Sequence, residues 1–183
     1  SASASTSSVT IPAHASGEII LGFAHRLGST KQSTLPSGYS DLGTATGGGS
    51  SSASRLFYKV ADGTETTFTS TNATACAVLI LDDVTSFGTP VFQAGSGNIT
   101  YPAATLVNHA GKSRVLRFAG HSNANSPVGD LVGYDLVTSA LSGGGVIVYA
   151  DSAGCTSTDP SSASQEFNPN IGGRGITLEV IGV

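Results

Sequence analysis

The feature that most constrains the fold of this 183-residue chain is an internal repeat, in which residues 91–183 match residues 9–90 in the same order. The gaps between the matched segments fall at clusters of turn-forming residues. A tandem repeat of this kind predicts two similar sets of secondary-structure elements. The matches place Pro12 over Pro102, Phe23 over Phe118, Tyr39 over Tyr134, Tyr58 over Tyr149, and CAVLILDDV from Cys76 over GITLEVIGV from Gly175.

Short β-rich runs make up both copies of the repeat. Examples are RLFYKVA from Arg55 and ACAVLIL from Ala75, and clusters of Gly, Ser, Asn, Asp and Pro separate such runs. No stretch combines a cap with apolar residues at helical spacing. The 24 Gly and the charged fraction of only 11% also fit strands and turns. These patterns predict an all-β chain, an antiparallel β-sandwich of jelly-roll type with about eight strands, four from each half.

One domain is expected to include both copies, because a set of four strands cannot bury both of its faces alone. We therefore predict a single β-sandwich over residues 9–183, with pseudo-repeats of about 9–90 and 91–183. The first eight residues, SASASTSS, show no apolar periodicity. They are predicted to form a flexible N-terminal arm.

Charge and hydropathy disfavour two classes of partner. Lys and Arg total 8 against 12 Asp and Glu, for a formal net charge of -4, and no basic cluster occurs. We therefore expect no nucleic-acid partner, because phosphate binding needs a positive surface. No apolar run reaches the ~18 residues of a membrane span, so no membrane partner is expected. The chain has two cysteines; Cys76 is interpreted as a buried thiol, and a bridge to Cys155 stays open.

No catalytic signature stands out, so the chain is interpreted as not being an enzyme. The G-x-S-x-G string of a hydrolase elbow is absent, and the four Glu residues are scattered. A hydrolase remains the least favoured alternative. No cofactor is expected, and a loop-built structural calcium site is the one exception left open.

Two pairs of residues that recur in both halves are the candidates for surface recognition. His25 and His121 each follow a Phe-Ala pair, and are interpreted either as glycan or metal contacts or as polar residues where each strand leaves the core. Tyr39 and Tyr134 fall at matched positions and are either stacking platforms for sugars or core residues with a hydroxyl at the rim. The loops 47–54 and 152–165 are expected to be mobile and to carry recognition.

Three segments of the first half carry a likeness to a known group of proteins. They are TIPAHASGE followed by an apolar strand, LPSGY, and RLFYKVADGTE. In this order they resemble small phage-encoded proteins and tail-protein modules, with Glu18 standing where Asp is more usual. The likeness is strong over the first half and loose over the second.

This resemblance implies a bacteriophage virion structural protein on the particle surface, in a tail fibre, a tail-tip adhesin or a head decoration. The implied partners are other virion proteins, further copies of the chain in a homo-oligomer such as a trimer, and a host-surface glycan. The apolar C-terminal strand GITLEVIGV is then expected as a buried edge or contact between copies. A free carbohydrate-binding β-sandwich module is the alternative function.

Overall fold

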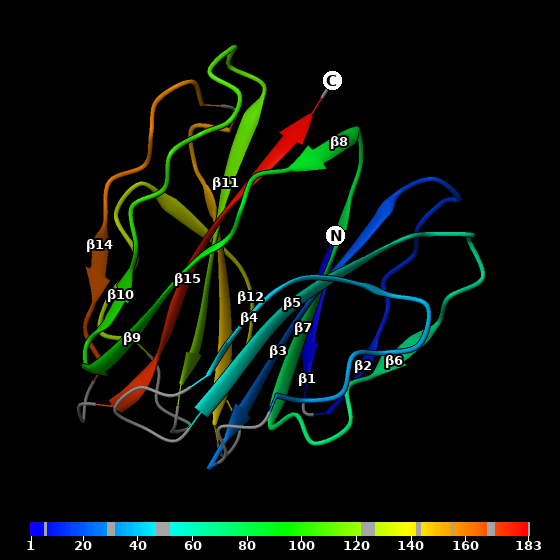
Figure 1. Ribbon diagram of the computed structural model, residues 1–183, viewed down its shortest axis with the longest axis horizontal. Helices are drawn as coiled ribbons and strands as arrows, with labels where there is room; N and C mark the ends of the chain where they lie inside the picture. Colours follow the sequence, from blue (N-terminus) through cyan, green and yellow to red (C-terminus); the bar gives the residue numbers. More distant parts are fainter. Residues whose placement is uncertain are drawn as a thin grey trace.

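The computed structural model describes residues 1–5, 7–28, 32–46, 52–121, 127–141, 144–154, 156–167 and 171–182, apart from the side chains of residues 96, 171 and 172. These residues form strands and no helix (Figure 1). The strands are β1 (Ala2–Ser5), β2 (Ser8–Thr10), β3 (Ile19–Leu27), β4 (Ser40–Thr46), β5 (Ser52–Val60), β6 (Thr67–Thr69), β7 (Ala75–Leu81), β8 (Val84–Phe87), β9 (Val91–Gly97), β10 (Ile99–Tyr101), β11 (Ser113–His121), β12 (Tyr134–Leu141), β13 (Gly145–Asp151), β14 (Ala163–Gln165) and β15 (Ile171–Gly182).

Two antiparallel sheets dominate the structure, and each is built mainly from one half of the chain; the exception is β8, which lies in the first half and joins the second sheet. The first sheet has the order β1-β7-β3-β5-β4. The second has the order β12-β13-β11-β15-β8, and β9 also pairs with β15. Read from β9, the second sheet runs β9-β15-β11-β13-β12, so each of its strands has a counterpart in the first sheet. In Figure 1 the blue-to-cyan strands of the first half lie beside the green-to-red strands of the second.

The strand register repeats in detail. Phe23 of β3 pairs with Leu56 and Ala77, and Phe118 of β11 pairs with Val148 and Ile176 at the same places in the second sheet. An irregularity in the register of the edge strands β4 and β12 also recurs in both sheets. The β4–β5 register shifts between Asp41 and Gly43, and the β12–β13 register shifts between Leu136 and Thr138. Both shifts follow from one extra residue, a β-bulge, which bends an edge strand at the equivalent position.

The two sheets pack face to face over one apolar core. Alternate residues of β3, β5 and β7 meet alternate residues of β11, β13 and β15, as the two-residue period of a strand requires. The rings of Phe23 and Phe118 touch across this core, with centroids 5.4 Å apart. Each sheet also buries residues on its outer face. The pair β2–β6 covers the first sheet, and β10–β14 covers the second.

Three expectations differ from the structure. The described residues contain fifteen strands rather than about eight. The order of β3, β4, β5 and β7 within the sheet is β7-β3-β5-β4, whereas the Greek keys of a jelly roll would place the second strand beside the first. The supposed arm contains β1, which pairs with β7 from Ala2 to Ser5. Open hydrogen-bonding groups along β7 explain why a polar segment without apolar periodicity becomes a strand.

The C-terminal strand β15 is also not a free edge. It lies between β11 on one side and β8 and β9 on the other, and its described apolar side chains are buried within its own chain. Of the two loops expected to carry recognition, residues 47–51 lie outside the described residues. Ser152, at the start of the second loop, directly follows β13. The second of these segments includes β14, which pairs with β10.

Candidate functional site

The two histidines singled out from the sequence are fully buried, so neither is a surface recognition residue. His25 and His121 both have 0% relative exposure. Strand alternation places them on different faces. His25 shares the parity of Phe23 and points between the sheets. His121 has the opposite parity to Phe118 and lies on the outer face of the second sheet. The matched segments of the sequence align His25 with Gly120 rather than with His121. This alignment already indicated that the two histidines lie on different faces.

His25 lies over a gap in the opposite sheet left by Gly120. A Cβ at Gly120 would come well under 3.0 Å from Nδ1 of His25, so this glycine makes room for the imidazole. Nδ1 of His25 lies 3.0 Å from Oγ of Ser54, while Nε2 has no hydrogen-bond partner among the described residues. Burial lowers the pKa of His25 to about 3, with smaller contributions from His121 and Arg174. The ring is therefore neutral at physiological pH.

The Ser54–His25 pair is the nearest arrangement to a hydrolase nucleophile and base. Both side chains are buried, and no carboxylate orients Nε2 of the ring. A histidine with a pKa near 3 is a weak base. The pair therefore lacks two features that a serine nucleophile needs, an orienting acid and access to substrate.

His121 packs on the outer face of its sheet, against aromatic and glycine neighbours. Its ring centroid is 5.2 Å from that of Phe167. A Cβ at Gly145, its register partner on β13, would overlap the imidazole. His121 thus fills space above a glycine within the outer-face cluster that includes Ile99 and Phe167.

Arg174 is a buried residue that sequence reasoning missed. It is 4% exposed, and it occupies the same face of β15 as Ile176, Leu178 and Val180, which belong to the core between the sheets. Burial lowers the pKa of its guanidinium. The sequence signal for a buried arginine was its spacing: Arg174 is followed at every second position by an apolar residue, Ile176, Leu178 and Val180.

The two tyrosines occupy equivalent positions and contribute to packing. Tyr39 stands edge-on to Phe57, with centroids 5.4 Å apart, and its ring centroid is 5.9 Å from that of Phe68. Burial raises the pKa of its hydroxyl to about 12, and this hydroxyl has no hydrogen-bond partner among the described residues. Tyr134 is covered by Arg117, whose guanidinium carbon lies 4.3 Å from the ring centroid. Neighbouring side chains therefore restrict access to both rings.

A buried polar cluster that the sequence did not predict contains Arg117, which lies over the Tyr101 ring, and the hydrogen-bonded residues Tyr101, Gln165 and Tyr149. The Arg117 side chain is 1% exposed and donates from Nη2 to the carbonyl oxygen of Ser161. Nearby, the Tyr101 hydroxyl donates to Oε1 of Gln165 at 2.7 Å. Nε2 of Gln165 donates to the Tyr149 hydroxyl at 2.7 Å. The cluster holds the β10–β14 pair onto the second sheet.

The register also corrects one of the matched pairs. Tyr149 pairs with Arg117, and the equivalent pair in the first half is Phe57 with Gly22. Tyr149 therefore corresponds to Phe57, and the match to Tyr58 was one residue out of register. Tyr58 instead faces the core between the sheets, where its ring lies 5.2 Å from that of Phe87.

The other two histidines make matching contacts with carboxylates. Nε2 of His14 lies 3.0 Å from Oε2 of Glu65, and Nε2 of His109 lies 2.8 Å from Oδ1 of Asp159. Each pair joins the segment after β2 or β10 to the segment before β6 or β14. Glu65 also contacts Nζ of Lys59 at 2.5 Å. These contacts fix equivalent loops in the two halves.

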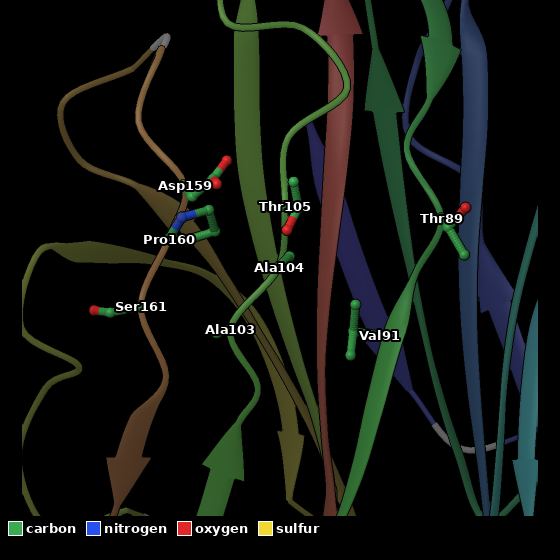
Figure 2. Close-up of a pocket in the computed structure, with 8 residues that line it drawn as sticks. All are labelled: Thr89, Val91, Ala103, Ala104, Thr105, Asp159, Pro160 and Ser161. Atoms are coloured by element: carbon green, nitrogen blue, oxygen red, sulfur yellow. The ribbon is translucent and has the colours of Figure 1, made fainter.

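Two surface depressions lie over the second half. The larger is an open groove of about 570 Å³, shown in Figure 2. Its lining is mostly small residues: Thr89, Val91, Ala103, Ala104, Thr105, Asp159, Pro160 and Ser161. The smaller, of about 290 Å³, includes Asp130, Leu136 and Tyr149. No aromatic side chain lines the groove, so it lacks the stacking surface common in sugar sites.

Among the described ranges, no three or more His, Cys, Asp or Glu side chains are grouped to hold a metal ion. Cys76 is a free, buried thiol whose pKa burial raises to about 12, and Cys155 lies outside the described residues. Nor does the described part of the chain contain a helix long and apolar enough to cross a membrane.

Comparison with known proteins gives no relative. No family model, no curated protein and no solved structure matches this chain.

Proposed function

We propose that this chain is a non-catalytic structural module on the surface of a bacteriophage particle, acting through protein–protein contacts and contact with the host surface. The proposal rests on the structural role of the three segments that resemble phage modules. In the structure these residues build turns and fix loops. A likeness carried by such residues fits a shared scaffold with variable surfaces, as expected of virion modules.

The segment RLFYKVADGTE illustrates this role. Its first part forms most of β5, and its second part is a loop organised by Glu65. The Glu65 carboxylate accepts hydrogen bonds from the backbone N–H groups of Asp62 and Gly63, in addition to its contacts with Lys59 and His14. Every charged residue after Arg55 in the segment thus takes part in one loop network.

The other two segments also consist of turn formers. Gly17 has φ of 96° and Gly38 has φ of 82°, values that favour glycine. Glu18 accepts a hydrogen bond from the backbone N–H of Ala15, and the N–H of Tyr39 donates to the carbonyl oxygen of Pro36.

The homo-oligomer contact that we propose lies near β12. This strand is an edge of the second sheet, and exposed apolar residues gather on it and just before it. Val132 is 94% exposed, Leu136 is 56% exposed and Val128 is 55% exposed. An open edge with neighbouring apolar side chains is a feature of strand-mediated association. β15, which the sequence suggested for this contact, is already enclosed.

The carbohydrate-binding alternative draws less support. Tyr39 and Tyr134 were its stacking platforms, and both rings are occupied by neighbours. A host-surface glycan contact stays within the main proposal, without these two residues as its platform.

Immunogold labelling tests the proposal. Antibodies raised against the purified chain are applied to particles of the phage whose genome encodes it. We expect gold at fixed positions on intact particles, and mass spectrometry of purified particles should detect the chain in a constant copy number. Unlabelled particles that lack the chain, or an encoding genome with no phage genes near it, would refute the assignment.

A further inference from the structure

Arg174 lies between the two sheets and has no partner for its charge among the described residues. Its Nε and Nη2 atoms are buried and make no hydrogen bond among the described residues. All 12 Asp and Glu of the chain lie within the described ranges, yet none forms an ion pair with Arg174. A buried guanidinium left without an acceptor is strongly unfavourable. The structure therefore contains donors suited to an anion that the chain does not provide.

His25 lies next to this guanidinium. Gly120 is the register partner of Arg174, so the two residues sit directly opposite each other on neighbouring strands and on the same face. The imidazole of His25, coming from the other sheet, occupies the space above Gly120. The His25 side chain and Arg174 therefore both border Gly120 between the sheets. Ser52, on the same face of β5 as Ser54, has a third unpartnered polar atom, Oγ.

The surroundings contain no compensating negative charge and offer a path from solvent. His121 and Arg174 are the charged or titratable neighbours that act on His25, and no carboxylate does. On its other side Arg174 pairs with Ala94, which is exposed and lies on the edge-forming strand β9. A small anion can therefore approach along this flank.

We propose that Arg174 and His25, with Ser52 beside them, form a binding site for one compact oxyanion between the ends of the two sheets. The planar guanidinium suits two oxygens of a phosphate, a sulfate or a carboxylate. Nε2 of the neutral imidazole donates a further hydrogen bond when Nδ1 accepts from Ser54. The proposal of this anion site does not depend on the proposed virion function.

Anion titration of the full chain tests this site. Thermal unfolding and NMR signals of the Arg174 Nε–H and the His25 ring are followed in chloride buffer at constant ionic strength. Sodium phosphate, sodium sulfate and sodium glucuronate are added separately. We expect a saturable rise in Tm of about 3–6 °C at a tenfold excess over Kd, accompanied by shifts of both NMR signals.

The three anions distinguish the source of the ligand. Saturation by phosphate or sulfate indicates a free inorganic anion, and saturation by glucuronate alone indicates the carboxylate of an acidic sugar. Either result supports the proposal. If none of the anions moves the Arg174 Nε–H signal of the wild-type chain, the proposal is wrong.

Variants separate specific binding from a general salt effect. Arg174→Met should lose the saturable shift and, without added anion, unfold at the wild-type temperature or above it, because the unpaired charge is gone. His25→Gln should weaken affinity about tenfold, since one hydrogen bond to the anion is perturbed. Arg114→Met, at an exposed position of β11, is the matched control and should bind as the wild type does. An equal response of Arg174→Met and wild type would overturn the proposal.

Discussion

At the scale of single residues, the two halves fill the same outer-face position in opposite ways. Gly22 in the first half leaves space that the ring of Phe57 occupies. Its counterpart Arg117 fills that space itself and contacts the rings of Tyr101 and Tyr134. At this position the first cluster therefore has an aromatic ring, whereas the second has a cation packed on aromatic rings, although the backbone register is the same.

Gly22→Ala should destabilise the chain by about 1–3 kcal/mol, because its methyl group overlaps the Phe57 ring in a packed cluster. Urea unfolding measures this change. In a Phe57→Leu background the same substitution should cost less, since the smaller side chain can move aside. Equal costs in the two backgrounds would show that the ring is not the obstacle.

Glu65→Gln should lower the free energy of unfolding by about 1–2 kcal/mol near pH 6, because charge-assisted hydrogen bonds are weakened. Burial alone would raise the pKa of Glu65, but Lys59, the Asp62 N–H and His14 together hold it below its ordinary value of 4.5. The hydrogen bond to the Pro12 carbonyl, followed by the one to Glu65, raises the pKa of His14 above 6.5.

The pH dependence of this difference follows from the two directions. The Glu65 contribution is present above pH 4.5 and is lost as the pH falls through its lowered pKa. The His14 contribution is complete below pH 6.5 and is lost as the pH rises through its raised pKa. The gap between wild type and Glu65→Gln should therefore be widest between about pH 5 and 6.5. A gap that does not vary with pH would argue against both ionisations.

At the scale of elements, edge strands decide which surfaces stay open. β1 covers β7, and its Ala2 and Ala4 side chains pack against the core. The bulges in β4 and β12 bend two further edges at equivalent places. A short covering strand such as β1 limits unwanted pairing between molecules at the edge of β7.

Removal of residues 1–5 should lower the free energy of unfolding by about 1–3 kcal/mol, because it breaks the hydrogen bonds to β7. It should also bare the edge of ACAVLIL, an apolar strand prone to pairing with other chains. Light scattering and urea unfolding test both effects, with exposed Ser5→Ala as a control. A truncated chain that stays monomeric and equally stable would contradict the assigned role of β1.

At the scale of the whole molecule, one core joins the two halves. The buried side chains of this core come from both large sheets. Neither half alone can therefore shield its inner face from solvent. The contact of Phe23 with Phe118 lies on this shared surface. The molecule should therefore unfold as one unit, with equal calorimetric and van't Hoff enthalpies.

Phe23→Ala and Phe118→Ala should each cost about 3–5 kcal/mol, because each opens a cavity in the core. The double variant should show a coupling of about 0.5–1.5 kcal/mol, since the two rings touch. Phe68 lies in the outer-face cluster of the first sheet, so Phe68→Ala combined with Phe118→Ala should be additive. Strict additivity of the Phe23 and Phe118 variants would contradict the shared core.

The all-β class could be predicted from the sequence, because strand periodicity and turn residues are local signals. RLFYKVA and ACAVLIL both form strands as expected. The candidate site was less accessible. His25 and His121 both follow a Phe-Ala pair, but His121 is one residue further from its pair. His25 therefore lies on the inner face of its sheet, and His121 lies on the outer face of the other sheet. The sequence shows this difference in spacing, but it does not show which residues pack against each face.

The sequence alone determined that the chain forms antiparallel strands, and where most of them begin and end, because these depend on residues close together along the chain. Only the tertiary structure decided the order of the strands within each sheet, that β1 covers β7, that β15 is enclosed, and that Arg174 and His25 both border Gly120. These features depend on contacts between residues far apart in the chain. Unpaired backbone groups and apolar faces become buried only when those distant segments meet.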